Sequence, residues 1–272
     1  MTKIFIDGQA ILAHSITRKL IENHKINPSD ILINTYNKLD SLPFINWMDN
    51  QGIKWFKSNY QDPSTLQIIA DFQPDYIISA YGVRVLPKAV IDLAKILAFN
   101  LHPAYLPDYK GRWVPTWAIL NGETEHGITF HVMAEEIDAG DILYQKKIPI
   151  AANETAYSLY YKILCEFVKE FDNFFNQLSA GNISPKPMSP GGRYFDRRMP
   201  FDGIIDPTWS LDFIEKFIRG MFFPPHSSAK IKIGDNYFEC DTMDDYYKII
   251  NLTIDNNLNT LYNSSKTGHP RL

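Results

Sequence analysis

Cysteine is scarce in this chain, which has only Cys165 and Cys240 among 272 residues. Cys165 lies in an apolar helical pattern and Cys240 ends a strand-like run, so both are expected to be ordinary thiols, with no disulfide framework and no zinc site. The sequence also lacks any apolar run that approaches the ~20 residues needed to span a bilayer. Its first residues, MTKIFIDGQA, have the pattern of a strand and a turn and not of a signal peptide. We therefore expect a cytoplasmic protein without a membrane partner.

A surplus of basic residues is absent as well, because 27 Lys and Arg face 31 Asp and Glu, for a net charge of -4. Proteins that wrap nucleic acid usually carry a basic face, so the composition disfavours a nucleic-acid partner. The sequence has no phosphate loop of the Gly-x-x-x-x-Gly-Lys type, and its first strand-turn has only Gly8 where dinucleotide-binding folds have Gly-x-Gly-x-x-Gly. These absences disfavour a nicotinamide-dependent oxidoreductase.

Apolar strand-like runs alternate with helical patterns along most of the chain. The expected strands are residues 3–8, 30–37, 53–56, 75–80, 96–102, 127–135 and 141–150, and the expected helices are residues 10–24, 65–73, 86–96 and 154–175, with a short one before residue 53. This alternation predicts an α/β fold with a twisted, mostly parallel sheet and helices on both faces. Such sheets bind ligands beyond the carboxyl ends of their strands.

A change in composition predicts a division into two domains. Residues 182–193, NISPKPMSPGGR, are rich in Pro and Gly and are expected to link a larger domain, residues 1–181, to a small α+β domain, residues 194–272. In the small domain we expect a helix at 210–221 capped by Ser210 and a hairpin at 228–243. The hairpin offers an edge for pairing with a second copy of the chain. The role of the Asn-rich tail, residues 251–272, stays open.

Asn100 and His102 stand at the end of one expected strand, two positions apart. In a strand, residues with this spacing project to the same side. His can exchange a proton near neutral pH, and Asn can donate a hydrogen bond to an oxygen that gains negative charge. The best candidate for a carboxylate that orients the imidazole is Asp138, with Asp141 second. The alternative is that these are ordinary polar residues of a loop at a strand end.

Several motifs in the same order resemble the folate-dependent formyltransferases, a family that includes the methionyl-tRNA, glycinamide ribonucleotide and nucleotide-sugar enzymes. The motifs are Asn100-Leu101-His102, Tyr105-Leu106-Pro107 with Lys110-Gly111, Gly127-Ile128-Thr129, and Ile137-Asp138-Ala139-Gly140. The resemblance is strongest over residues 75–150 and includes the upstream segment SAYGVRVLPKAV. The later segments RYFDRRMPFDGIIDPTWS and FIRGMFFPP resemble the nucleotide-sugar branch.

The resemblance implies a Rossmann-like domain that transfers a formyl group from N10-formyltetrahydrofolate to an amine without a metal. It implies that Asn100 and His102 stabilise an oxyanion, and that Asp138 holds the imidazole and helps to relay the proton of the amine. It also implies folate contacts from Tyr81, Arg84, Val85, Leu86, Glu136, Ile137, Asp138 and Asp141. Its nucleotide-sugar branch further implies a homodimer through the C-terminal part.

A nucleotide-linked sugar carries a diphosphate, which suits Arg and Lys, and a base, which suits an aromatic ring. The candidates for these contacts are Lys110, Gly111, Arg112, Trp113, Arg193, Tyr194, Arg197, Arg198 and Phe222. In the nucleotide-sugar branch we expect a dTDP-linked amino-dideoxyhexose for surface polysaccharide such as the O-antigen of lipopolysaccharide, with dTDP-Qui3N favoured over dTDP-Qui4N. The ring position of the amine and the choice of dTDP or UDP stay open. The alternatives are a methionyl-tRNA-type or other amine formyltransferase and an inactive nucleotide-sugar- or folate-binding protein. The net acidic charge of the chain and the short part after the linker disfavour the tRNA-directed enzyme.

Overall fold

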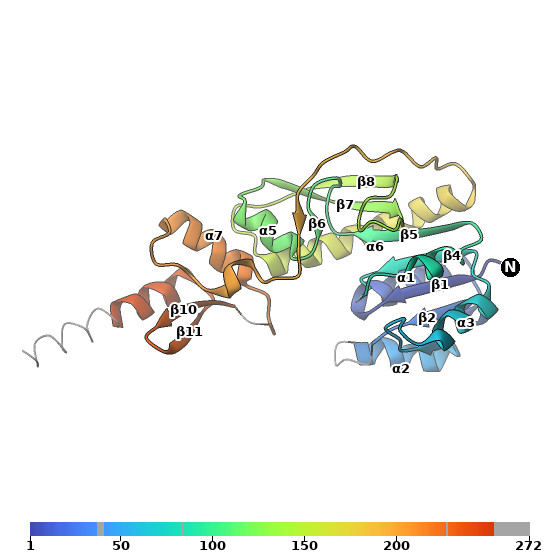
Figure 1. Cartoon of the computed structure of the whole chain (residues 1–272), viewed down its shortest axis with the longest axis horizontal. Coiled ribbons are helices and arrows are strands. Elements are labelled where there is room, and N and C mark those ends of the chain that lie inside the picture. Colours follow the sequence, from blue (N-terminus) through green and yellow to red (C-terminus); the bar gives the residue numbers. More distant parts are fainter. Residues whose placement is uncertain (37–40, 83, 227, 253–272) are drawn as a thin grey trace, which may run out of the picture. The chain divides into compact units, whose positions relative to one another are not determined.

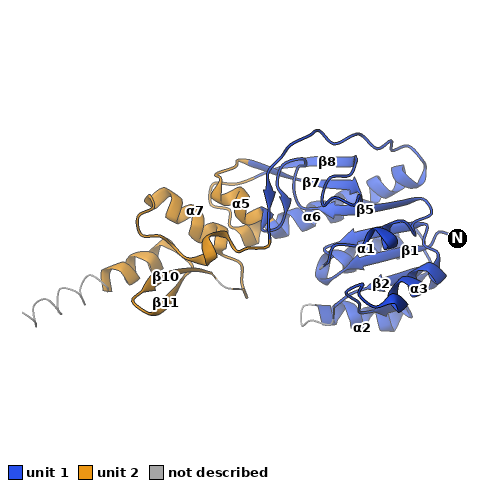
Figure 2. Cartoon of the chain, in the orientation of Figure 1, with its two compact units in different colours: residues 1–114, 125–149, 160–196 blue, residues 115–124, 150–159, 197–272 orange. Residues whose placement is uncertain are grey.

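The computed structural model describes residues 1–36, 41–82, 84–226 and 228–252. The chain divides into two compact units (Figure 2): unit 1 comprises residues 1–114, 125–149 and 160–196, and unit 2 comprises residues 115–124, 150–159 and 197–272. Both units combine segments that are distant in sequence, and the domain boundaries expected at 181 and 193 stay a prediction. The tail 253–272 and Asn37, at the end of one expected strand, lie outside the described residues.

One twisted sheet forms the centre of unit 1 (Figure 1). In the described residues it has the strand order β3-β2-β1-β4-β5-β7-β8. The strands are β1 (Ile4–Gly8), β2 (Ile31–Asn34), β3 (Lys54–Phe56), β4 (Tyr76–Ala80), β5 (Leu97–His102), β7 (Glu125–Val132) and β8 (Ile142–Pro149). The first five are parallel, whereas β7 is antiparallel to both β5 and β8. The expected α/β fold with a mostly parallel sheet is confirmed.

Helices cover the sheet on both faces. They are α1 (Ala10–Glu22), α2 (Leu42–Gln51), α3 (Pro63–Phe72), α4 (Lys88–Ile91) and α6 (Ala156–Ser179), with a 3-10 turn, η1 (Pro28–Asp30). On one face Ile77 of β4 packs with Ile69 of α3 and Val90 of α4. On the other face the ring of Phe99 lies 5.4 Å from that of Phe174 of α6. Because neither face meets water, the central strands have continuous apolar runs instead of alternating ones.

The structure corrects the expected helix at residues 86–96, because α4 spans only Lys88–Ile91. The amides of Lys95 and Ile96 donate to the carbonyls of Pro74 and Asp75, at 3.0 and 2.9 Å. These bonds lead the chain into β5 and leave no room for further helical turns. The sequence patterns also missed α5 (Val114–Leu120) and the two-residue strands β6 (Lys110–Gly111) and β9 (Tyr194–Phe195). Segments this short carry no periodicity.

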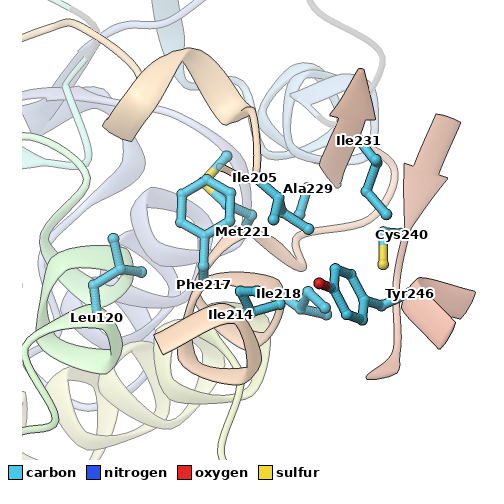
Figure 3. Packing of buried hydrophobic residues seen from close by; sticks show 10 residues of the cluster. All are labelled: Leu120, Ile205, Ile214, Phe217, Ile218, Met221, Ala229, Ile231, Cys240 and Tyr246. Atoms are coloured by element: carbon cyan, nitrogen blue, oxygen red, sulfur yellow. The ribbon is translucent and has the colours of Figure 1, made fainter. Parts of the chain in front are cut away.

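Unit 2 contains the expected helix and hairpin, as α7 (Leu211–Met221), β10 (Ala229–Ile233) and β11 (Asn236–Cys240), together with a 3-10 turn, η3 (Pro200–Gly203). Ser210 caps α7 as predicted, since its hydroxyl accepts a hydrogen bond from the Phe213 amide at 3.2 Å. Side chains of α7 and the hairpin share one apolar core (Figure 3). The buried members are Leu120, Ile205, Ile214, Phe217, Ile218, Met221, Ala229, Ile231, Cys240 and Tyr246. Unit 2 thus has a core of its own, to which Leu120 contributes from outside the C-terminal part.

Candidate active site

The structure brings Asn100, His102 and Asp138 together at the carboxyl end of β5. One oxygen of Asp138, Oδ1, lies 3.4 Å from Nδ1 of His102 and 3.5 Å from Nδ2 of Asn100. His102 is 3% exposed, and the side chain of Asp138 is 9% exposed. The sequence-based expectation that these three side chains lie close together is therefore met by the geometry.

A tight loop after β7 places Asp138. The amide of Val132 donates to the carbonyl of Asp141 at 2.8 Å, which closes the loop at its base. A Cβ at Gly140 would lie 1.9 Å from the carbonyl oxygen of Val132, so only glycine allows this close approach. Asp138 itself has φ of 52°, in the left-handed region that Asp tolerates better than most residues. The Ile-Asp-x-Gly motif thus meets a geometric need of the loop.

The hydrogen bonds of His102 define its protonation pattern. Nε2 lies 2.8 Å from the carbonyl oxygen of Tyr109, which can only accept, so Nε2 carries the proton. The other ring nitrogen, Nδ1, faces Asp138 at 3.4 Å. Burial lowers the pKa of His102 below its ordinary value, against the opposing influence of the Asp138 charge. His102 is accordingly neutral at rest, with Nδ1 ready to accept a proton.

Asp138 is the anion of the site. Burial acts to raise its pKa, but His102 and the backbone amide of Gly111 act to lower it, and the pKa lies below the ordinary value. A charged imidazole at His102 would lower the pKa of Asp138 most, but burial keeps that imidazole neutral. We assign the negative charge to Asp138 in either case, because the Gly111 amide donates to its Oδ2 at 2.9 Å whatever the state of His102.

His131 belongs to the site, although the sequence reading gave it no partner. It stands directly opposite Asn100 in the antiparallel pairing of β5 and β7. Its Nδ1 donates to the carbonyl of Val132 at 2.9 Å, so its Nε2 accepts from the Asn100 amide at 3.1 Å. Nε2 also lies 3.5 Å from Oδ1 of Asp138. His102 pairs with Thr129 in the neighbouring strand, so Asn100 pairs with the residue two positions further along, which is His131. That register is the signal that could have identified it.

The residues expected to contact folate lie on two turns at the same edge of the sheet. The turn after β4 holds Tyr81, which is 40% exposed, Val85, which is 60% exposed, and Leu86, which is buried. Because β4 and β5 are parallel neighbours, this turn lies beside the end of β5. The other turn holds Asp138 and the exposed Glu136, Ile137 and Asp141.

Arg84 lies apart from the three central side chains and lines a cavity of about 480 Å³. Lys57 and Ser58, which follow β3, line the same cavity, as does Ser64 at the start of α3. The cavity therefore lies toward the other half of the parallel sheet. Val83, within the motif that holds Arg84, lies outside the described residues.

The residues expected to contact a nucleotide-sugar divide between the units. Lys110 and Gly111 form β6, and Gly111 touches Asp138 through its amide. Arg112 and Trp113 follow directly in the chain. β9, which begins at Tyr194, pairs with β6, and Arg193 binds Asp108. Arg197, Arg198 and Phe222 belong to unit 2, where the carbonyl of Phe222 accepts from the Tyr157 amide at 3.2 Å.

Two absences complete the description of the site. Across the ranges that the structure covers, no three His, Cys, Asp or Glu side chains are grouped so that they could hold a metal ion. Over the same part of the chain, every helix is too short or too polar to cross a bilayer.

The parallel-rich α/β sheet thus brings together, at its carboxyl edge, an amide, an imidazole and a carboxylate, the residue types that acid–base chemistry uses. Residues 12–169 match the formyl transferase family. GDP-perosamine N-formyltransferase of Brucella melitensis is 36% identical over 181 residues, which are 66% of this chain and 70% of that protein. The chain therefore belongs to the formyl transferase family, and the resemblance seen in its motifs is confirmed.

Solved structures agree with this assignment at the level of the fold. An N-formyltransferase from Helicobacter canadensis, in complex with folinic acid and dTDP-3-aminofucose, aligns with a TM-score of 0.69 at 24% identity over 86% of this chain and 85% of that one. A sugar N-formyltransferase from Shewanella aligns with a TM-score of 0.73 at 18% identity over 88% of this chain and 96% of that one. The protein is a formyl-transfer enzyme.

Proposed function

We propose that this enzyme transfers the formyl group of N10-formyltetrahydrofolate to the amino group of a nucleotide-linked amino sugar. The observation that carries the proposal is the convergence of Asn100, His102 and Asp138 at the ligand-binding edge of a formyl transferase sheet. The similarity to GDP-perosamine N-formyltransferase and to a sugar N-formyltransferase from Shewanella supports a sugar as the acceptor. The Helicobacter complex with folinic acid supports a folate as the donor.

The residues at the sheet edge fit a folate. The exposed apolar side chains of Tyr81, Val85 and Ile137 lie on the two turns that flank the end of β5 and suit a flat fused ring. Backbone groups of Arg84, Val85 and Leu86, and of the turn that ends at Asp138, are proposed to pair with the polar edge of that ring. When bound, the folate supplies the one-carbon group.

In the proposed mechanism, Asp138 and His102 handle the proton. Asp138 is an anion beside the neutral Nδ1 of His102, at 3.4 Å. The carboxylate accepts a proton from the attacking amine, directly or through a water, and His102 takes up positive charge as that proton is shared between them. The carbonyl of Tyr109 holds the opposite side of the imidazole and keeps Nδ1 directed at Asp138. The His102–Asp138 pair also supplies the proton that the leaving nitrogen needs.

Asn100 is proposed to bind the formyl oxygen as negative charge develops on it. One N–H of its amide is held by His131 at 3.1 Å. The other makes a contact of 3.5 Å with Asp138, at the limit of a hydrogen bond, so an oxyanion can compete for it. His131 thus fixes the amide with its nitrogen toward the reacting atoms.

For the acceptor, we propose a dTDP-linked amino-dideoxyhexose, dTDP-Qui3N first and dTDP-Qui4N second. Lys110 and Arg112, which both belong to unit 1, are proposed to bind its diphosphate. Trp113 and Tyr194 of the same unit are the proposed contacts to the base. A GDP-linked amino sugar is the alternative to a dTDP-linked one, and the 36% identity to GDP-perosamine N-formyltransferase favours it.

Three further properties belong to the same proposal. The enzyme acts in the cytoplasm, where folate donors and nucleotide-sugars are both present. It forms a homodimer through the C-terminal part, in which Tyr237 and Phe238 of β11 are 52% and 43% exposed. Light scattering of the purified protein tests the dimer. The linker at 182–193 marks the boundary of the catalytic domain, which limited proteolysis tests.

Mass spectrometry of the products tests the reaction. The enzyme is incubated with N10-formyltetrahydrofolate and, in turn, dTDP-Qui3N, dTDP-Qui4N, GDP-perosamine and a UDP-linked 4-aminopentose. We expect one product heavier by a formyl group, with dTDP-Qui3N as the first choice. His102→Ala is expected to bind folate normally and to transfer no formyl group. Transfer to none of the four sugars would overturn the proposed acceptor class, and near-normal turnover by His102→Ala would overturn the mechanism.

A further inference from the structure

We propose that Arg193 is a positioning residue of the active site, which holds the loop of residues 108–111 and through it His102 and Asp138. The inference deepens the proposed function, on which its kinetic test rests. It differs from the sequence-based expectation, in which Arg193 contacts the substrate. All the residues concerned belong to unit 1.

Arg193 makes a two-pronged contact with one carboxylate. Its Nε lies 2.9 and 3.0 Å from the two oxygens of Asp108, and its Nη2 donates to Oδ2. The backbone amide of Arg193 donates to the same carboxylate at 2.8 Å. The guanidinium also lies over the ring of Tyr109, 4.3 Å from its centroid. A planar fork that binds a carboxylate and stacks on an aromatic ring is a use of Arg that Lys cannot reproduce.

Backbone hydrogen bonds join the segments on either side of the Arg193–Asp108 contact. The Lys110 amide donates to the Arg193 carbonyl, and the Arg112 amide donates to the Phe195 carbonyl, both at 2.9 Å. These bonds form the parallel pair of β6 and β9. A Cβ at Gly192 would lie 1.8 Å from the Pro107 carbonyl oxygen, so the two segments approach as closely as backbones allow. Residues 192–195 therefore form a strap across the loop that follows the Asn-x-His motif.

The strapped loop supplies two of the backbone contacts that hold the reacting groups. The carbonyl of Tyr109 accepts from Nε2 of His102 at 2.8 Å, which leaves Nδ1 facing Asp138. The amide of Gly111 donates to Oδ2 of Asp138 at 2.9 Å. Tyr109 is buried, and its ring stacks on Phe195 of the strap at 5.4 Å between centroids. A shift of the loop would therefore move both partners of the His102–Asp138 pair together.

The charge on Asp108 agrees with this role. Its hydrogen bond with the Arg193 side chain lowers the pKa of Asp108 below the ordinary value, so the carboxylate stays ionised at neutral pH. Both of its oxygens are occupied by Arg193. The side of the guanidinium that carries Nε and Nη2 is therefore directed at Asp108.

The test compares Arg193→Met, Arg193→Lys and Asp108→Asn with the wild-type enzyme. Arg18→Met is the matched control, because Arg18 forms an exposed ion pair with Glu22 on α1. Hydrogen–deuterium exchange reports on the loop without any substrate. We expect the amides of residues 109–112 to exchange about 10-fold faster in Arg193→Met and in Asp108→Asn, with no change in Arg18→Met.

Formyl-transfer kinetics give the second readout. We expect kcat to fall by roughly 10- to 100-fold in Arg193→Met, with KM for both substrates changed by less than about twofold. Arg193→Lys is expected to lie nearer to Arg193→Met than to the wild type, because Lys keeps the charge and loses the fork. A substrate ligand would behave otherwise: KM for the sugar would rise, kcat would hold, and Lys would restore most of the activity.

The two readouts separate the possible failures. Unchanged exchange at residues 109–112 in Arg193→Met would overturn the inference, as would the KM pattern of a substrate ligand. If the wild type transfers no formyl group, the proposed function fails, while faster exchange in the variants would still support the strap.

Discussion

Asp7 gives the sharpest prediction about stability, because the structure buries a carboxylate with one satisfied oxygen. Asp7 is the residue before the last one of β1 and is 2% exposed. Its Oδ1 accepts from the Asn34 amide at 2.8 Å and from the Tyr60 hydroxyl. Its Oδ2 has no hydrogen-bond partner among the described residues. Burial raises the pKa of Asp7 from 3.8 to about 6, although the bonds from Tyr60 and Asn34 act to lower it.

The sign of the pH effect follows from that pKa. The folded protein binds the proton of Asp7 more tightly than the unfolded chain does, so folding stability from this group is full below pH 3.8 and is lost as the pH rises through about 6. The difference between 3.8 and about 6 corresponds to about 3 kcal/mol, at about 1.4 kcal/mol for each pH unit. Above pH 7 the wild type carries this cost in full.

Asp7→Asn removes the charge and keeps an oxygen for Asn34 and Tyr60. Urea unfolding of both proteins at pH 4.5 and at pH 8 measures the effect. We expect the free energy of unfolding of the variant, relative to the wild type, to rise by about 2 kcal/mol between the two pH values, because part of the effect is already present at pH 4.5. Asp49→Asn is the control, because Asp49 is an exposed acceptor for Trp55 and should show no such trend. A stability difference between Asp7→Asn and the wild type that does not vary with pH would refute the reasoning.

Three further predictions concern other links between sequence and function. Asp138→Asn should lower kcat by roughly 10²- to 10⁴-fold at unchanged circular dichroism, and a turnover within about threefold of the wild type would contradict its role. Gly82→Ala places a Cβ 2.3 Å from Oδ2 of Asp7, so thermal unfolding should show a loss of about 1–3 kcal/mol; an unchanged midpoint would argue against this packing. Phe217→Ala should cost unit 2 about 3–5 kcal/mol in urea unfolding, because Phe217 is fully buried in that core, and a loss below about 1 kcal/mol would contradict the core assignment.

The elements that were predicted correctly are those whose pattern depends only on residues close to each other in the sequence. The buried runs of β1 and β4, the Ser210 cap of α7 and the hairpin turn before Asn236 were all predictable, because each depends on neighbours within a few residues. The helix expected at 86–96 was wrong, because hydrogen bonds to residues 74 and 75 end it early. No local pattern could show those partners.

The residues of the candidate site also divide into those that the sequence identified and those that only the structure showed. Asn100 and His102 were identifiable because a strand places alternate residues on one side, and the ordered motifs supplied Asp138 as a candidate. His131 was missed, because its partner Asn100 lies 31 positions away and is reached only through antiparallel pairing. The positioning contact of Arg193 with Asp108 spans 85 positions.

The sequence by itself determined the alternation of strands and helices, the acid–base residue types at the end of one strand, and the family to which the chain belongs. These properties reside in local periodicity and in short motifs. Only the tertiary structure decided the direction of β7 and β8, the orientation of the His102 imidazole between Tyr109 and Asp138, and the strap that holds the loop between them. The physical reason is that hydrogen bonds between distant segments depend on how the sheet brings those segments together, and local sequence does not encode that proximity.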